Sequence, residues 1–412
     1  MSGTDAGLFA AAELWAGLTP GPEAEIAIAA HVADTALALA LGWRAKTGGG
    51  LLFAGDWTNR LSAAVAAARS TEIDDIHRAA CVTAGAVIVP VVLAMLEEEL
   101  GDPAHASAAV TAGYDAMVSI AKAASGPGLL SEGVLPTLRV APMGAAVAAA
   151  RLLGLGPETM AMAIAAAASA TTGRPGHPVG NAPWRWRAVG EAARTGMIAA
   201  LGAEAGLTAD PKLVPPMGRP IGEGAIMQTS FKPFCAARQT LSAIQGFREI
   251  LPRVDPATIT RIRVAVPSAT RAMIAAPFDP GGGRMGSIAS LAYHLNLCLG
   301  APARLHDIVR TPFVAGVSAV EAMLDIEDDP DMDRMFPEVW PARVLVIAAG
   351  QAHEALVTHA EGDPESGYGR AELQSKFAGH VEMLGAPVVS RIGTLLSPRW
   401  SSERGLMDAL CP

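Results

Sequence analysis

Three carboxylates and an imidazole gather directly ahead of a strongly apolar run. Glu72, Asp74, Asp75 and His77 precede the run 86–95, which has the composition of a buried helix. Ionised groups beside an apolar helix cost free energy unless they are paired or used in chemistry. If the helix begins here, Asp74 and His77 share one face at i, i+3, so a carboxylate could orient an imidazole for proton transfer.

The same cluster also has a structural interpretation. Asp74 and Asp75 are acids of the kind that the positive end of a helix dipole favours, and His77 could be held by structural hydrogen bonds. For Asp74 the catalytic and the structural interpretation both stay open. For Asp75 the structural interpretation is favoured.

Basic side chains further along the chain could hold an acid. Trp184 and Arg185 stand out in a chain with only 5% aromatic residues. A guanidinium binds a carboxylate through two hydrogen bonds, and an indole can wall a pocket. Lys232 and Arg238 could hold a carboxylate or stabilise an enolate, and Lys232 could transfer a proton if burial lowers its pKa. The alternatives are a helix cap or subunit contact for the first pair, and ion pairs with the acidic cluster for the second.

Two further side chains are weaker candidates. His177, in a Gly/Pro-rich loop, could supply an imidazole, and Tyr293 lies on a predicted helix of the second domain. Apart from the cluster at His77, the histidines and cysteines show no spacing typical of metal ligands. The glycine run 281–283 lacks the strand and helix that flank a phosphate-binding loop. The spacing therefore supports neither a metal site nor a phosphate-binding loop.

Periodicity predicts how these residues are positioned. Apolar spacing and Pro/Gly punctuation predict helices at 23–41, 57–68, 76–101, 106–124, 141–154, 157–171 and 184–206. Alternation at 259–266 predicts a strand, and 342–348 with 354–359 predicts a hairpin. We therefore predict a mainly α protein. Its large all-helical domain would cover 1–252 and 386–412, and a smaller α/β lid domain would cover 253–385. A cleft between two such domains is a common ligand site.

Composition narrows the class of protein. A chain of 412 residues is too long to form one compact core. Its 51% of hydrophobic residues against 17% of charged residues indicate that the chain is folded. A net charge of −9 offers no basic surface for nucleic acid. The four cysteines form no CxxC pair, which is typical of a reducing cytoplasm. Charges, Gly and Pro interrupt the apolar stretches, and the N-terminus lacks a basic segment before an apolar one. We expect a soluble cytoplasmic protein without a signal peptide.

Motifs along most of the chain resemble the MmgE/PrpD family. The segments that resemble the family, in the family's order, are 72–85, 113–114, 133–137, 141–146, 151–155, 190–196, 231–238, 287–293 and 362–377. The resemblance implies a helical domain with an α/β lid, usually in a dimer. It also implies a cofactor-free lyase or epimerase that acts on small carboxylic acids.

The chain departs from this family at its histidines. Thr83 stands where the family has the histidine of His-Pro-Gly, and Leu135 where it has the histidine of Gly-x-His-Pro-Thr. Leu241 replaces the histidine that ends the Lys-Pro segment, and the usual lysine before the central helix falls near Arg185. Because imidazole is the side chain best suited to proton transfer near neutral pH, the family's acid/base mechanism does not carry over intact.

These observations lead to one main expectation. We expect a lyase-type enzyme, similar to a dehydratase or decarboxylase, that acts on an organic acid between the two domains. The residues expected to be catalytic are Asp74, His77, Thr83 and Lys232. The residues expected to bind the substrate are Glu72, Leu135, Thr137, His177, Trp184, Arg185, Arg238 and Tyr293.

Two alternatives stay open. One is an isomerase or cyclase that acts on a larger, more apolar biosynthetic intermediate, since Leu and Thr make the site less polar than imidazole would. The other is a ligand-binding homologue without catalysis. In each case the expected partners are a small molecule and a second copy of the chain, and neither nucleic acid nor a membrane.

Overall fold

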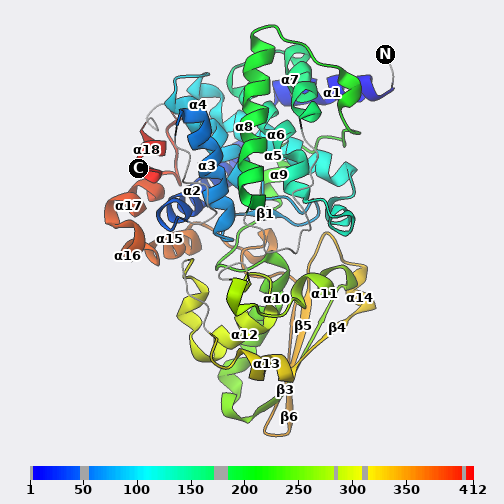
Figure 1. Cartoon of the computed structure of the whole chain (residues 1–412), viewed down its shortest axis with the longest axis vertical. Coiled ribbons are helices and arrows are strands. Elements are labelled where there is room, and N and C mark those ends of the chain that lie inside the picture. Colours follow the sequence, from blue (N-terminus) through cyan, green and yellow to red (C-terminus); the bar gives the residue numbers. More distant parts are fainter. Residues whose placement is uncertain (1–2, 47–54, 171–183, 283–285, 309–313, 401–404) are drawn as a thin grey trace. The chain divides into compact units, whose positions relative to one another are not determined.

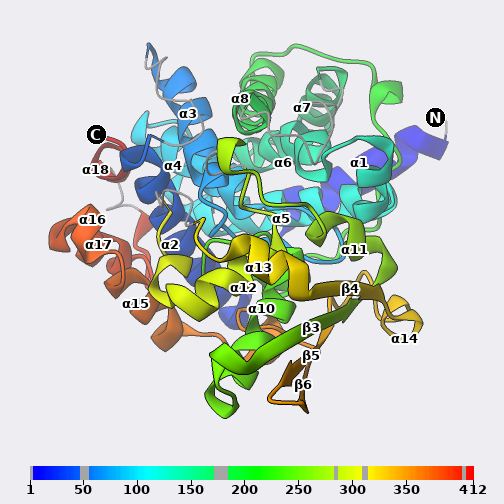
Figure 2. The ribbon, with the colours of Figure 1, turned by 60° about the horizontal axis from the view of Figure 1, so that its bottom comes forward.

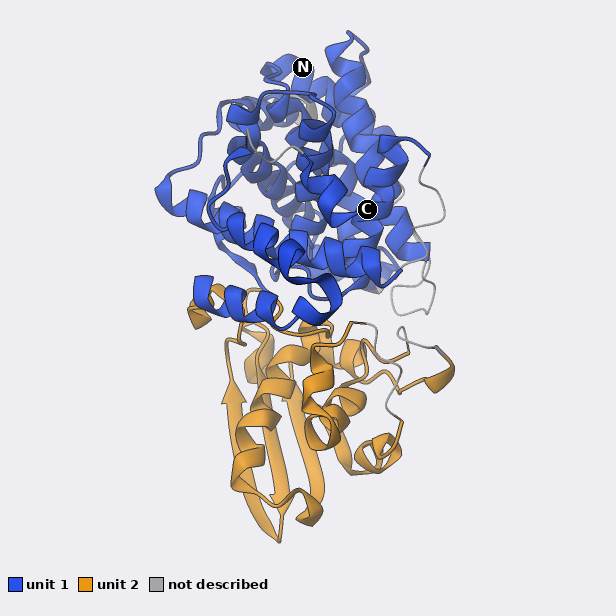
Figure 3. Cartoon of the chain, turned by 90° about the vertical axis from the view of Figure 1, so that its left-hand side faces the viewer, with its two compact units in different colours: residues 1–231, 369–412 blue, residues 232–368 orange. Residues whose placement is uncertain are grey.

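The computed structural model describes residues 3–46, 55–170, 184–282, 286–308, 314–400 and 405–412. The chain divides into two compact units, which Figure 3 colours separately. Unit 1 comprises residues 1–231 and 369–412, and unit 2 comprises residues 232–368. Helices predominate among the described elements, so the predicted mainly α fold is confirmed.

Unit 1 is built from helices that follow one another along the chain (Figure 1). Its helices are α1 (Gly3–Gly17), α2 (Pro22–Arg44), α3 (Trp57–Ser70), α4 (Gly85–Glu97), α5 (Ala106–Ala123), α6 (Pro136–Leu152), α7 (Pro157–Ser169), α8 (Trp184–Glu204), α9 (Gly224–Met227), α15 (Arg370–Ala378), α16 (Val381–Leu384), α17 (Ala386–Thr394) and α18 (Leu406–Leu410). Helix α6 packs between α5 and α8. A Cβ atom at Gly196 of α8 would collide with the Pro142 carbonyl of α6, so small residues set this close approach.

Helix α2 lies in the interior of unit 1. By length and composition it is the one helix of the described chain that could cross a membrane. However, 78% of its most apolar stretch is buried inside the structure, as in the core helix of a globular domain. The C-terminal helices α15, α16 and α17 all pack against α2, and Figure 2 shows them beside it. The two ends of unit 1 in sequence are therefore joined in space.

Unit 2 contains a four-stranded sheet in the order β4-β3-β5-β6. The strands are β3 (Ile259–Val266), β4 (Leu324–Asp328), β5 (Ala342–Ala348) and β6 (Gln351–Val357), and only β4 runs parallel to β3. The predicted strand and hairpin are confirmed, with a two-residue turn at Ala349 and Gly350, both at positive φ. The other helices are α10 (Arg238–Ile250), α11 (Ser268–Ile274), α12 (Leu291–Gly300), α13 (Val317–Met323) and α14 (Pro330–Asp333).

The boundaries between the two units lie at other positions than the composition indicates. We predicted the smaller domain at 253–385, whereas unit 2 covers 232–368. Helix α10 packs onto β5 and β6, and its apolar side chains join the core of unit 2. In the other direction, α15 contacts α2 and belongs to unit 1. The partner of an amphipathic helix depends on the surface that it buries, which composition alone does not reveal.

The predicted helix over 76–101 is wrong in its first part. Helix α4 begins only at Gly85, and residues 72–83 form a non-helical segment with a turn at 78–81, which we call the acidic segment. All of its residues except the half-buried Cys81 are buried. Within it, β1 (Ile76–His77) pairs antiparallel with β2 (Thr229–Ser230), so unit 1 is not entirely helical. Glu72 and Cys81 both have positive φ, near 56° and 55°, which is unusual for residues other than glycine. The i, i+3 face predicted for Asp74 and His77 therefore does not exist.

Candidate functional site

Asp75 is the centre of a buried hydrogen-bond network in unit 1. Its Oδ1 accepts the backbone N–H of Gly85 at 2.9 Å, and its Oδ2 accepts the Tyr114 hydroxyl at 2.6 Å. Nδ1 of His31 lies 2.9 Å from the same Oδ2. Burial alone would raise the pKa of Asp75, but the contacts with His31, Tyr114 and Gly85 outweigh it and lower the pKa below its ordinary value. Asp75 thus ties the acidic segment to α2, α4 and α5.

Sequence reasoning missed His31 and the role of Tyr114. His31 lies on α2 among apolar residues, 2% exposed, and its ring stacks on Phe231 with 4.3 Å between centroids. A lone histidine in an apolar helix carries no local signal of its partner. Tyr114 was noticed only as part of the Gly113–Tyr114 pair. Its long separation from Asp75 in sequence hid the contact.

Gly85 leaves room for this network. A Cβ atom at Gly85 would lie 2.5 Å from Thr35 Oγ1 and 2.6 Å from both Asp75 Oδ2 and Tyr114 Oη. We therefore expect Gly85→Ala to destabilise unit 1 by about 1–3 kcal/mol, the usual cost of overpacking. Chemical denaturation measures this cost. Gly393→Ala in α17 is the control, because its Cβ would meet nothing within 4 Å. An unchanged midpoint for Gly85→Ala would contradict the packing described here.

Lys376 supports the acidic segment from the C-terminal part of the chain. Its Nζ donates to Asp34 Oδ1 at 2.6 Å and to the Ile73 carbonyl at 3.0 Å, and both charged side chains are buried. Burial raises the pKa of Asp34, and the Lys376 ammonium opposes that rise. We predicted the segment around Lys376 as part of the lid, whereas α15 belongs to unit 1.

Asp74 is paired with Arg69 of α3. The guanidinium of Arg69 donates to Asp74 Oδ2, and its Nη2 lies 3.8 Å from Glu72. Asp74 is fully buried and Glu72 is 6% exposed, so this is a desolvated cluster of charges. The prediction that Asp74 orients His77 is wrong, because Asp74 bonds Arg69 and His77 bonds backbone.

Arg185 and Trp186 adjoin this cluster at the start of α8. The Arg185 guanidinium lies 4.2 Å from the centre of the Trp186 ring, and that of Arg69 lies 5.0 Å from it. Burial lowers the pKa of Arg185, and the Glu72 carboxylate opposes that shift. The indole beside Arg185 is therefore Trp186, since Trp184 is 65% exposed. His177 lies outside the residues that the structure describes.

His77 is buried and neutral. Its Nδ1 accepts the backbone N–H of Ala80 at 3.2 Å, and the residue is only 2% exposed. Burial, with the nearby charges of Lys122 and Arg78, lowers the pKa of His77 to about 4. Within the described part of the chain, Nε2 of His77 is buried and has no hydrogen-bond partner. A buried polar atom of this kind is uncommon and calls for an explanation.

Thr83 and Thr137 lie side by side. The Thr83 backbone N–H donates to Thr137 Oγ1 at 3.2 Å, and the two hydroxyl oxygens are also 3.2 Å apart. Both residues are buried. Leu135 precedes α6 in extended conformation and is half-buried. The structure therefore brings together Thr83, which was expected to be catalytic, and Thr137, which was expected to bind the substrate.

Three expected site residues belong to unit 2. Lys232 and Tyr293 are buried there, and the Tyr293 ring stacks on Phe278 with 5.0 Å between centroids. Nη2 of Arg238 donates to both carboxylate oxygens of Asp363, at 2.8 and 2.6 Å. His359 and Glu365 lie near Asp363 in a geometry that could hold a metal ion. That group does not suit a cation, because the guanidinium of Arg238 already neutralises Asp363.

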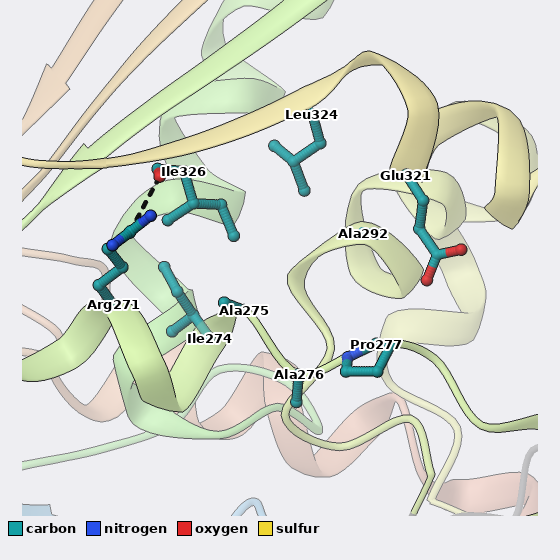
Figure 4. A pocket seen from close by; sticks show the side chains of 9 residues that line it. All are labelled: Arg271, Ile274, Ala275, Ala276, Pro277, Ala292, Glu321, Leu324 and Ile326. Atoms are coloured by element: carbon teal, nitrogen blue, oxygen red, sulfur yellow. Dashed lines mark hydrogen bonds between the residues drawn. The ribbon is translucent and has the colours of Figure 1, made fainter.

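Unit 2 also contains an open pocket of about 360 Å³ (Figure 4). Its lining residues come from α11 and the following residues 275–277, from α12, α13 and β4, and Arg271 and Glu321 are its charged members. Arg271 is turned to the strand, since its Nε donates to the Ile326 carbonyl at 3.1 Å. Glu321 accepts the backbone N–H of Phe278 at 3.1 Å. None of the expected site residues lines this pocket, so the candidate site remains the acidic segment of unit 1.

Comparison with known proteins gives a family match within unit 1. Residues 24–217 match the family model described as the MmgE/PrpD N-terminal domain. A comparison with curated proteins gives no match. The matched range includes the acidic segment, the Thr83–Thr137 pair and the start of α8, and membership is consistent with a dehydratase-like or related enzyme. The match over residues 24–217 supports membership of the MmgE/PrpD family.

Proposed function

We propose that this chain is a lyase- or isomerase-type enzyme that acts on an organic acid at the acidic segment of unit 1. The observation that carries the proposal is the buried Nε2 of His77, without a partner in the described chain and flanked by Lys122 and Arg78. A desolvated polar atom in positive surroundings favours an anionic ligand. Family membership supports an enzyme, and the resemblance implies that it needs no cofactor.

The backbone of the acidic segment supports the same proposal. Glu72 and Cys81 have left-handed backbone conformations, which cost free energy. Residues keep such conformations where contacts with the surrounding structure fix the backbone. Asp75 and Lys376 supply the contacts that do so. Rigid support of this kind keeps a site in one geometry, which reactions that stabilise charge require.

Arg185 is the proposed anchor for the substrate carboxylate. Its planar guanidinium can bind a carboxylate through two hydrogen bonds while its face stacks on Trp186. Dehydration, decarboxylation and epimerisation all begin by moving a proton or charge next to a carboxylate. Positive groups that are fixed in advance stabilise the charge that develops in such steps.

An isomerase or cyclase acting on a more apolar intermediate is the second candidate. It is favoured by Leu135 and Thr83, which put an apolar group and a hydroxyl at positions where the resemblance implies imidazoles, and by the contact of Thr83 with Thr137. With less acid/base capacity, orientation and charge stabilisation would supply more of the rate.

Proton NMR of the purified full chain with unsaturated and hydroxylated di- and tricarboxylic acids tests the proposal. We expect turnover of at least one acid, and Arg185→Met should lower kcat/KM roughly 100-fold, as loss of one charge-stabilising donor does. Arg261→Met is the matched control, since Arg261 pairs with Asp325 on an exposed part of unit 2. Binding without turnover across the panel would instead identify a ligand-binding homologue, and normal turnover by Arg185→Met would remove its role as anchor.

A further inference from the structure

We infer that His77 acts as a hydrogen-bond donor of fixed tautomer toward an anionic substrate oxygen, and does not transfer a proton. The inference rests on the proposed function, because it assigns a ligand to the same site. It changes the role that proton-transfer chemistry would give this imidazole. The geometry that supports it lies entirely within unit 1.

The backbone around His77 selects the tautomer. The N–H of Ala80 donates to Nδ1, and only a ring nitrogen without a proton can accept it. A neutral imidazole carries one N–H, so the proton must be on Nε2. The main chain of His77 is itself fixed, since its N–H donates to the Val82 carbonyl at 2.8 Å and β1 pairs with β2. The ring is therefore held from both its backbone and its Nδ1.

This tautomer excludes His77 as a general base near neutral pH. Nε2 already carries the proton, and the lone pair of Nδ1 is engaged by Ala80. Lys122 and Arg78 oppose a second proton on the ring, while Asp75 is the nearby group that favours it. Burial outweighs Asp75 and keeps the ring neutral. What remains available to a ligand is the Nε2–H donor.

The vacant donor indicates the chemistry of its partner. Nε2 is buried and bonds no other group in the described residues, and an unsatisfied buried donor costs free energy. A carboxylate or enolate oxygen would satisfy it, and the charges of Lys122 and Arg78 favour an acceptor that carries negative charge. A neutral imidazole can polarise a carbonyl oxygen in this way without becoming charged.

Nitrogen-15 NMR of the histidine rings tests the tautomer without any ligand. We expect one protonated nitrogen, Nε2, and no titration of the His77 ring between about pH 5.5 and 8, a window that spans the ordinary histidine pKa. Succinate, malonate and citrate serve as probes and should shift the Nε2 resonance. A protonated Nδ1, a ring that titrates near its ordinary pKa, or no shift with any of the three acids would overturn the inference.

Variants test the donor itself. His77→Gln retains an N–H near the position of Nε2 and should bind the most effective probe within about 10-fold of the wild type, whereas His77→Leu should bind it roughly 10- to 100-fold more weakly. His353→Gln on β6 is the control and should bind normally. Equal losses in the Gln and Leu variants, with both folded by circular dichroism, would contradict a donor role. Wild-type binding with the expected tautomer but no turnover would refute the proposed enzyme and leave the donor intact.

Discussion

Asp75→Ala is expected to destabilise unit 1 by about 3–5 kcal/mol, as the loss of one partner from a buried charged network does. The substitution removes the acceptor of the Gly85 N–H and the Tyr114 hydroxyl, and it removes the carboxylate beside the His31 ring. Each of these groups is buried, so water cannot replace the carboxylate. Chemical denaturation followed by tryptophan fluorescence measures the loss.

Two further variants make this prediction specific. Asp102→Ala removes an exposed carboxylate that accepts the nearby Ala104 N–H, and it should cost about 1 kcal/mol or less. Asp75→Asn keeps the volume and one acceptor oxygen, so its loss should lie between the two. A cost for Asp75→Ala no larger than that of Asp102→Ala would show that the network does not hold the acidic segment.

The pH dependence of Asp75 has a definite sign. The folded pKa lies below the ordinary value of 3.8, so the folded state binds this proton less readily than the unfolded state. The stabilisation from Asp75 is therefore complete above that value and is lost as the pH falls through the lower folded pKa. Wild-type stability should fall more steeply in this acid range than that of Asp75→Asn.

Lys376→Met is expected to cost a similar amount, about 3–5 kcal/mol, because it leaves the Asp34 carboxylate buried without its cation. The acidic segment would also lose the donor to the Ile73 carbonyl. Lys376→Met should therefore disturb the acidic segment, even though residues 73 and 376 lie far apart in sequence. Denaturation and binding of the succinate probe measure the two consequences.

A double-mutant cycle isolates this ion pair. In an Asp34→Asn background, Lys376→Met should cost much less than in the wild type, since no buried charge is left unpaired. Lys212→Met, at an exposed lysine of unit 1, is the control and should change stability by less than about 0.5 kcal/mol. Additive costs for Lys376→Met and Asp34→Asn would mean that the two side chains do not depend on one another.

Local pattern was sufficient for most elements. Alternation in β3 and in the β5–β6 hairpin and the apolar spacing of α2 and α3 are properties of neighbouring residues, and the structure has these elements where they were expected. Strand β4 was not foreseen. Its Asp325 and Glu327 pair with Arg261 and Arg263 on β3, so its acidic residues look like those of a loop until the partner strand is known.

The acidic segment shows why local pattern fails at the site. The run 86–95 has the composition of a helix, and nothing in residues 72–83 forbids its extension toward the N-terminus. The helix begins at Gly85 because the Asp75 carboxylate accepts the N–H of Gly85, and because β1 pairs with β2 about 150 residues away in sequence. Tertiary contacts overrode the local preference there.

By itself, the sequence determined the mainly α class, the strands of the hairpin, the family resemblance and the chemical types present at the site. Only the tertiary structure decided their partners: Arg69 for Asp74, His31 and Tyr114 for Asp75, and backbone for His77. The physical reason is that the pairing of buried charges depends on distances in space. Two groups such as Asp34 and Lys376 are far apart in the chain, so no periodicity or spacing in the sequence predicts their contact.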